Sequence, residues 1–288
     1  MSPRRAWRDY ADLVALLLGG IALLLAAVWF GLKRETLAEL DDDIRFAFFT
    51  TKLESGLMSD LLGWMTSGPV LLVTAAAVVL SLLQRQWRLA VAIPLITLAA
   101  IVLAAALRES ILHRSPGIPK GEMTLPSANT TVALVLAVAV ICAVPRMLRP
   151  LASLAGGFLV GGVAIGSLAK QWHRPSDIVA AVAVLLIAAA CSFFLTSRQT
   201  APRVRAAGFD RAVGHPALAT LGAGLAAWRW VALDMQPISG SRSHTLFYGS
   251  IVVLAVVIGI GLGMCAVVAD RHFPPAARLF PLRTKVTS

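Results

Sequence analysis

A histidine and an aspartate, His173 and Asp177, lie four residues apart in the polar stretch Trp172–Asp177, between two long apolar runs. This spacing is about one helical turn, and the intervening Pro175 is tolerated in the first turn of a helix. The carboxylate can then orient one imidazole nitrogen and leave the other free to act as a nucleophile or general base. The alternative interpretation is an interfacial histidine beside an aspartate that caps a helix.

Two further polar clusters also border apolar segments. Arg108 and Arg114 follow one segment, with His113 beside them, and guanidinium groups bind phosphate oxygens bidentately and keep their charge. Ser127 and Asn129 open another segment, where small polar side chains and free backbone N–H groups form an anion site. Taken alone, these clusters are equally typical of interfacial arginines and of a well-capped helix.

The three clusters together predict one phosphate-handling site assembled from three loops. His173 and Asp177 are its predicted catalytic residues. Its predicted phosphate-binding residues are Arg108, Arg114, Ser127, Asn129, Lys170 and Arg174.

Bulk composition is that of a polytopic membrane protein. Mean hydropathy is +0.78, 58% of residues are hydrophobic and only 14% are charged. The net charge of +11 comes from arginines in short loops between apolar runs, which indicates membrane topology rather than nucleic-acid binding. The three cysteines lie inside apolar runs at no metal-ligand spacing, so we expect no disulfide, zinc site or other cofactor.

Apolar stretches of roughly 17–25 residues, enough to cross a bilayer, occur about eight times. They lie near 13–32, 67–83, 89–107, 127–145, 150–169, 177–196, 216–233 and 246–269. The first is too long for a simple signal peptide and no small-residue cleavage site follows it, so we interpret it as a retained span. The predicted fold is all-α, a polytopic membrane helix bundle of about eight transmembrane helices.

Basic residues concentrate on one set of loops, which includes both termini and the loop around Arg203. The positive-inside rule places these loops in the cytoplasm. The three polar clusters and Lys120 then face outside. We therefore predict an integral plasma-membrane protein with cytoplasmic termini and an outward-facing site, and the dominance of arginine over lysine favours a bacterial source.

Between the first two spans lies a polar and amphipathic segment, residues 33–66. It is typical of an interfacial helix on the outer surface, and the alternative is a lid that guides a lipid headgroup to the site. The triplet Asp41-Asp42-Asp43 is not a good metal site, because three adjacent carboxylates do not converge on one face of a helix.

The three clusters resemble the motifs of the type 2 phosphatidic acid phosphatase superfamily of integral membrane lipid phosphatases. Those motifs are Lys-x6-Arg-Pro, Pro-Ser-Gly-His and Ser-Arg-x5-His-x3-Asp, on outer loops of a six-span core. The resemblance implies a metal-independent phosphohistidine mechanism in which His173 attacks phosphorus, Asp177 orients it and Ser127 binds phosphate. It covers roughly residues 13–197, a six-helix phosphatase-like core. A cytoplasmic segment, 1–12, precedes it, and a loop, two additional spans and a basic tail, 198–288, follow.

The basic motif residues depart from that pattern. Arg108 stands for the lysine of the first motif, and Arg114 follows after five intervening residues instead of six. In the third motif Gly166-Ser167 replaces the Ser-Arg pair, so one phosphate-binding arginine is missing. Lys170 or Arg174 would have to compensate for it.

The second motif has Asn129 where the family has the histidine that protonates the leaving group, and an amide is no acid at physiological pH. His113 could supply a substitute proton, or it is a plain interfacial histidine.

The motif residues that are present and the one that is missing lead to two alternative functions. The first is a metal-independent phosphoric ester or diphosphate hydrolase acting on a phosphorylated membrane lipid, such as a polyprenyl diphosphate. The second is an inactive relative that binds a phospholipid or polyprenyl phosphate, or serves as a partner subunit.

The expected partners are therefore a phosphorylated lipid and the bilayer, and not nucleic acid. A transporter is disfavoured because the apolar spans contain few ionisable residues. The main exception, Arg229, is flanked by Trp228 and Trp230, as is typical of a membrane interface.

Overall fold

The computed structural model describes residues 3–48, 67–113, 124–197, 209–233 and 241–273, and in these ranges the chain is helical and contains no strand. The helices are α1 (Pro3–Val28), α2 (Glu35–Ala47), α4 (Ser67–Leu83), α5 (Trp87–Ala106), α6 (Ala128–Ala143), α7 (Arg149–Ala169), α8 (Pro175–Thr196), α9 (Phe209–Leu233) and α10 (Ser241–His272). Short π-helical segments, Trp29–Lys33 and Leu107–Ile111, extend α1 and α5. The predicted all-α fold is confirmed.

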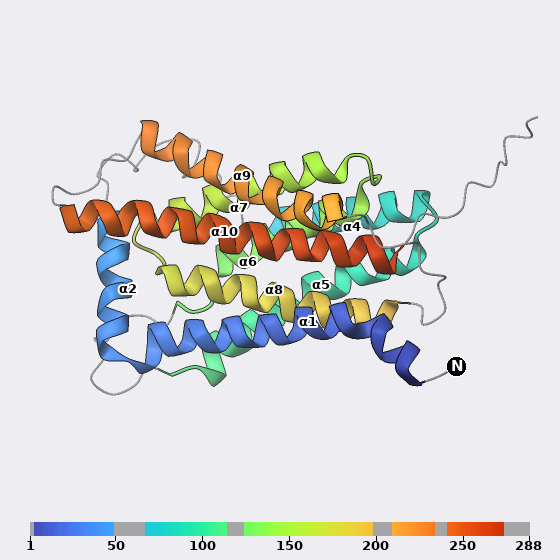
Figure 1. Cartoon of the computed structure of the whole chain (residues 1–288), viewed down its shortest axis with the longest axis horizontal. Helices are drawn as coiled ribbons and strands as arrows, with labels where there is room; N and C mark the ends of the chain where they lie inside the picture. Colours follow the sequence, from blue (N-terminus) through green and yellow to red (C-terminus); the bar gives the residue numbers. More distant parts are fainter. Residues whose placement is uncertain (1–2, 49–66, 114–123, 198–208, 234–240, 274–288) are drawn as a thin grey trace, which may run out of the picture.

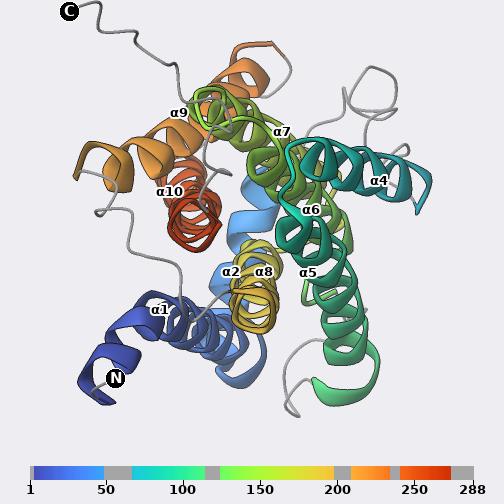
Figure 2. The ribbon, with the colours of Figure 1, turned by 90° about the vertical axis from the view of Figure 1, so that its right-hand side faces the viewer.

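The long helices run roughly along one axis, and α2 stands across one end of them (Figure 1). Seen end-on, α8 occupies the middle of the bundle, with α1, α5, α6 and α10 around it (Figure 2). Almost every side chain of α8 from Pro175 to Phe193 is buried, and its apolar residues are distributed all round the helix. A helix that is hydrophobic on every side belongs in the core of a bundle. The first turn of α8, which carries Asp177, is therefore anchored in the core of the bundle.

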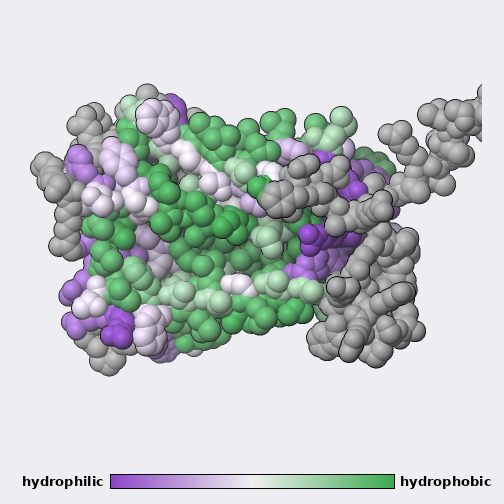
Figure 3. All heavy atoms as spheres, viewed as in Figure 1, coloured by the Kyte–Doolittle hydropathy of each residue, from purple (hydrophilic) through white to green (hydrophobic). Residues whose placement is uncertain are grey.

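Among the described residues, five helical segments are long and apolar enough to cross a membrane. They are Tyr10–Lys33, Trp87–Ile111, Arg149–Ala169, Pro175–Thr196 and His244–His272. Pro69–Leu83 and Ala128–Ala143 are apolar but shorter. Hydrophobic side chains cover the middle of the surface in Figure 3, and hydrophilic ones gather towards its ends. These features support a helical membrane protein, while the prediction of eight spans and a six-helix core remains a prediction.

The packing of α9 against α7 and α10 depends on glycines at the helix contacts. A Cβ atom at Gly157 or Gly222 would overlap a backbone carbonyl of the facing helix, that of Ala219 or Leu154. Between α9 and α10, a Cβ atom at Gly259 would overlap the hydroxyl oxygen and the backbone nitrogen of Thr220. Small residues let membrane helices approach closely and gain dispersion contacts and Cα–H···O contacts. The last two helices are thus packed tightly onto the rest of the bundle.

We expect Gly222→Ala to lower the free energy of unfolding by about 3 kcal/mol, the upper end of the usual cost of overpacking. The new methyl group would meet the carbonyl oxygen of Leu154, which belongs to the backbone and cannot rotate away. Gly224→Ala, two residues along the same helix, would meet nothing within 4 Å and should gain about 0.5–1 kcal/mol from helix propensity. The melting temperatures of the two purified variants test this, and equal values would contradict the packing argument.

A buried ionic cluster joins the last helix to the α6–α7 loop, at the end of the bundle opposite α2. Asp270 accepts hydrogen bonds from Arg149 and, at 3.1 Å, from Arg146 Nε. His215 Nε2 lies 3.5 Å from the second carboxylate oxygen, and its Nδ1 is 3.3 Å from Ser153 Oγ. Arg149 is fully buried. In the sequence these arginines count only as basic residues that indicate a cytoplasmic loop. In the structure they also hold α10 against the bundle through Asp270.

Candidate functional site

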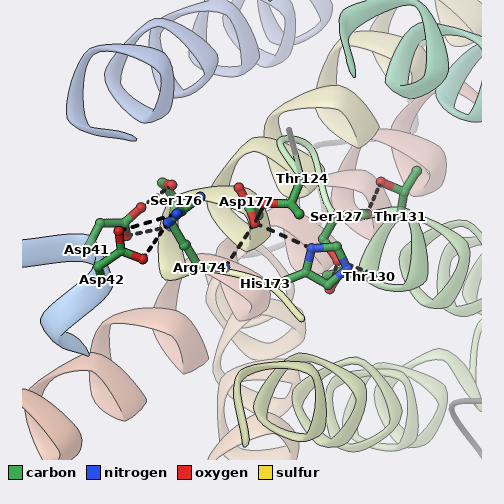
Figure 4. Close-up of polar contacts among 10 residues, drawn as sticks. All are labelled: Asp41, Asp42, Thr124, Ser127, Thr130, Thr131, His173, Arg174, Ser176 and Asp177. Atoms are coloured by element: carbon green, nitrogen blue, oxygen red, sulfur yellow. Dashed lines mark hydrogen bonds and ion pairs between the residues drawn. The ribbon is translucent and has the colours of Figure 1, made fainter. Parts of the chain in front are cut away.

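His173 and Asp177 meet at the start of α8, at the end of the bundle where α2 lies (Figure 4). The Nδ1 atom of His173 is 3.3 Å from Oδ2 of Asp177. The geometry arises locally, because α8 begins at Pro175 and a side chain at the first turn can reach back to the residues before it. The spacing predicts this pairing and the structure contains it, whereas a catalytic role for the pair remains a prediction.

Two further donors hold the same carboxylate oxygen. The hydroxyl of Thr124 donates to Asp177 Oδ2 at 2.6 Å, and the backbone N–H of Arg174 donates to it at 2.9 Å. Asp177 is 1% exposed, so its orientation is fixed by these bonds and not by solvent. A carboxylate held in this way can keep a proton on Nδ1 of His173 and leave Nε2 with the lone pair. Thr124 is not among the site residues that the sequence predicts.

The start of α6 lies against the start of α8. The backbone N–H of Ser127 donates to the carbonyl of Asp177 at 3.0 Å. The Ser127 hydroxyl caps α6, accepting from the N–H of Thr130 at 3.3 Å and donating to the Thr130 hydroxyl at 2.9 Å. Asn129 lies in the same first turn and is partly exposed. Two of the three predicted clusters are therefore brought together, and in this state Ser127 is engaged in capping.

Arg174 is not available for a phosphate in this structure. Its Nε and one terminal nitrogen donate to the two carboxylate oxygens of Asp42, at 2.7 and 3.2 Å. Asp42 also pairs with Arg45 on its own helix, at 2.9 Å. The side chains of Arg174 and Asp42 are 7% and 18% exposed, so the pair lies at the edge of the α2–α8 contact.

Helix α2 is fastened to the site at two more points. Asp41 accepts the backbone N–H of Ser176 at 3.1 Å and also its hydroxyl. The side-chain amide of Gln171 donates to the carbonyl of Arg45 at 2.7 Å. The sequence predicts an interfacial helix or a lid over residues 33–66. Within this segment α2 lies across the end of the bundle, beside the site, and residues 49–66 lie outside the described residues. In the described part of the chain, no three His, Cys, Asp or Glu residues are placed to hold a metal ion.

We expect stability to fall as pH rises from about 4 to about 7, because of Asp41. Burial raises the pKa of Asp41 from 3.8 to about 7, and the charge of Asp177 adds to this, while the hydrogen bonds from Ser176 oppose it. Between these pH values the folded protein keeps a proton that the unfolded chain has lost, so unfolding becomes easier as pH increases. Below and above this window the proton count of Asp41 is the same in both states.

The measurement is the change in melting temperature between about pH 5 and about pH 8. Asp41→Asn keeps an oxygen for the Ser176 N–H and should reduce that change. Glu39→Gln removes an exposed carboxylate from the same helix and should leave it as in the wild type. A change of equal size in wild type and Asp41→Asn would exclude this role for Asp41.

Of the other predicted site residues that the structure describes, Arg108 and His113 are not drawn into the cluster around His173. Arg108 lies on the π-helical segment after α5 and pairs with its neighbour Glu109 at 3.5 Å. His113 is exposed, and the ammonium group of Lys170 lies 4.9 Å from the ring centroid of Trp172. Arg114 and Lys120 lie outside the described residues, as does Arg203. Ser167, at the position of the missing motif arginine, is fully buried in α7.

Comparisons with protein-family models, with curated proteins and with solved structures give no match. The resemblance to the type 2 phosphatidic acid phosphatases therefore depends on the motif residues alone, and membership of that superfamily remains a prediction.

Proposed function

We propose that this membrane protein binds a phosphorylated lipid where α2, α6 and α8 meet, and hydrolyses it through a phosphohistidine on His173. The observation that carries the proposal is the Thr124–Asp177–His173 chain of hydrogen bonds, 2.6 and 3.3 Å long. It holds one imidazole nitrogen against a buried carboxylate, which is how a neutral histidine is prepared for nucleophilic attack.

The reaction has two steps. In the first, the lone pair of His173 Nε2 attacks phosphorus, the bond to the leaving-group oxygen breaks, and Asp177 stabilises the positive charge on the imidazole. In the second, water attacks the phosphorus, the P–N bond breaks, and inorganic phosphate leaves. Asn129 cannot donate a proton as an acid would, so the leaving group must be stable as an anion or take its proton from water or from another residue.

A second candidate function is binding of a phosphorylated lipid without turnover. One observation favours it: the site has Asn129 in the position of the motif acid. The two functions differ in whether His173 changes its covalent state.

Release of inorganic phosphate by purified protein from a panel of lipid phosphates and diphosphates tests the proposal, with His173→Ala as the control. Hydrolysis by the wild type and none by a folded His173→Ala variant is the expected result. Binding of the same lipids to both proteins, with release by neither, would replace the enzyme with the binding function. Turnover that survives in His173→Ala would refute the nucleophile.

A further inference from the structure

The turn between α4 and α5, at the end of the bundle opposite α2, contains an arginine in a left-handed backbone conformation. Arg85 has a φ angle of 57°, which residues other than glycine and asparagine seldom adopt. Its N–H donates to the carbonyl of Leu82 at 2.8 Å, and the next N–H donates to that of Ser81 at 2.9 Å. These two bonds define a Schellman motif, in which glycine is the usual residue at the left-handed position. An arginine at this position is therefore unfavourable for the backbone alone.

A turn of the same kind ends α7, and there the unusual residue has a function in the fold. Gln171 has a φ angle of 60°, and its side-chain amide donates to the carbonyl of Arg45 and holds α2 in place. The side chain of Arg85 is exposed, and it makes no hydrogen bond, ion pair or ring contact with the residues that the structure describes. A contact explains the residue at position 171. By the same reasoning, Arg85 indicates a partner outside the described chain.

The neighbouring Arg88 is also without a carboxylate partner among the described residues. It lies in the first turn of α5, over the ring of Trp87 at 4.8 Å, and donates to the carbonyl of Thr196 at 3.5 Å. Its Nε atom has no hydrogen-bond partner in the described structure. The sequence contains no aspartate or glutamate between residues 67 and 107 or between 124 and 176, the segments that include α4, α5 and α6. The surface near these two arginines is thus basic.

Exposed apolar side chains adjoin the two arginines. The side-chain amide of Gln84 donates to the carbonyl of Ala143 and so joins the turn to the α6–α7 loop, where Met147 and Leu148 are exposed. Trp87, also exposed, is the first residue of an apolar segment long enough to cross a membrane. Figure 2 looks onto this end of the bundle, where α4, α5 and α6 lie side by side. Cations beside exposed apolar side chains, at the edge of an apolar span, match the level of phospholipid headgroups.

We propose that the α4–α5 turn and the α6–α7 loop bind the headgroup of an anionic phospholipid, with Arg85 and Arg88 at its phosphate. Guanidinium groups pair well with phosphate oxygens, and the exposed apolar side chains would contact the glycerol and the first part of the acyl chains. A zwitterionic phospholipid has the same phosphate, but its own cation cancels the charge. This surface lies at the opposite end of the bundle from His173, so the inference goes beyond the proposed hydrolysis and does not depend on it.

The experiment measures binding of fluorescent phosphatidylglycerol, an anionic phosphodiester lipid, to the full-length protein in phosphatidylcholine vesicles. Arg85→Asn removes one charge and keeps a residue that tolerates the left-handed turn, and Arg88→Gln removes the other charge. Each change should weaken binding about 5-fold, the usual contribution of one arginine near a membrane surface. Added salt should weaken binding by the wild type. Phosphatidylcholine with the same label should bind equally to all three proteins.

Arg34→Gln is the matched control for these variants. Arg34 is also exposed and lies over a tryptophan ring, that of Trp29. It is at the other end of the bundle, however, and directly precedes α2 with its five carboxylates Glu35, Glu39, Asp41, Asp42 and Asp43. Its replacement should therefore leave the binding of phosphatidylglycerol as in the wild type.

A second measurement separates the side chain of Arg85 from the backbone of the turn. Arg85→Gly relieves the unfavourable conformation, so its melting temperature in neutral detergent should equal that of the wild type or exceed it. Phosphatidylglycerol that binds the folded protein raises the melting temperature, and this increase should be smaller in Arg85→Gly. A merely structural role of Arg85 would give the reverse, a lower melting temperature without lipid and an unchanged increase with it.

The remaining outcomes are equally decisive. Equal binding of phosphatidylglycerol and phosphatidylcholine by the wild type would overturn the inference. Wild-type binding in both Arg85→Asn and Arg88→Gln, or an equal loss in Arg34→Gln, would overturn it as well. His173→Ala should bind phosphatidylglycerol like the wild type, whether or not the wild type releases phosphate, so a failure of the proposed hydrolysis would leave this surface intact.

Discussion

Asp177→Asn is expected to lower phosphate release about 10⁴-fold, by analogy with the loss of the orienting aspartate in a catalytic triad. In the wild type, Asp177 Oδ2 faces His173 Nδ1 at 3.3 Å and accepts from Thr124 and from the backbone of Arg174. An amide oxygen that keeps the Thr124 and Arg174 donors would still face Nδ1 of His173, because all three groups meet the same oxygen of Asp177. It is a weaker acceptor than a carboxylate and carries no charge, so it would hold the Nδ1 proton less firmly and would not stabilise the positive charge that forms on the imidazole when Nε2 attacks phosphorus.

Single-turnover measurements on a good substrate check this result, because they separate the attack on phosphorus from product release. Asp43→Asn is the matched control, since it makes the same chemical change at an exposed position on α2. The side chain of Asp177 also accepts a hydrogen bond from the backbone N–H of Arg174 and so helps to cap the start of α8. Because its replacement could unfold the protein, the melting temperature of each variant is measured as well. A folded Asp177→Asn protein within tenfold of wild type would exclude the orientation mechanism.

Local sequence signals predict the elements of this site well. The side chain of Ser127 caps the N-terminus of α6, and Pro175 is the first residue of α8. His173 and Asp177 are one helical turn apart in the sequence and form a hydrogen bond. In each case the responsible forces act within a few residues: an N-cap hydroxyl, the fixed φ of proline and the pitch of a helix. The predicted apolar stretches coincide with helices for the same reason, since hydropathy and length are local properties.

Pairings between distant residues were not predictable in this way. Arg174 looks like a free phosphate ligand in the sequence, and its partner Asp42 is 132 residues away. The aspartate triplet is predicted not to bind a metal, and nothing in its spacing indicates that Asp41 and Asp42 dock onto α8. Likewise Arg149 and Asp270, 121 residues apart, appear in the sequence only as charges next to a span. Such contacts depend on how whole helices pack, which the residue pattern of one segment does not specify.

A lipid diphosphate is expected to be hydrolysed about 10²–10⁴-fold faster than a lipid phosphomonoester, the range that general acid catalysis typically contributes. Expelling an alkoxide from a monoester needs a proton donor, and the position of the motif acid is held by Asn129 in the first turn of α6. Expelling phosphate from a diphosphate needs that proton far less, because phosphate is stable as an anion. The comparison uses a polyprenyl diphosphate and the monophosphate of the same chain, so that the apolar part is constant.

Asn129→His is the gain-of-function test of the same argument. It places an ionisable imidazole on the turn whose Ser127 N–H donates to Asp177, and it should raise monoester turnover towards the diphosphate rate while changing the diphosphate rate little. His113→Ala measures the one alternative proton source among the predicted residues, an exposed side chain at the end of a described range. Equal rates on both substrates in wild type and in His113→Ala would refute the leaving-group argument. A preference for the diphosphate that Asn129→His removes would identify the missing acid as the cause of the selectivity.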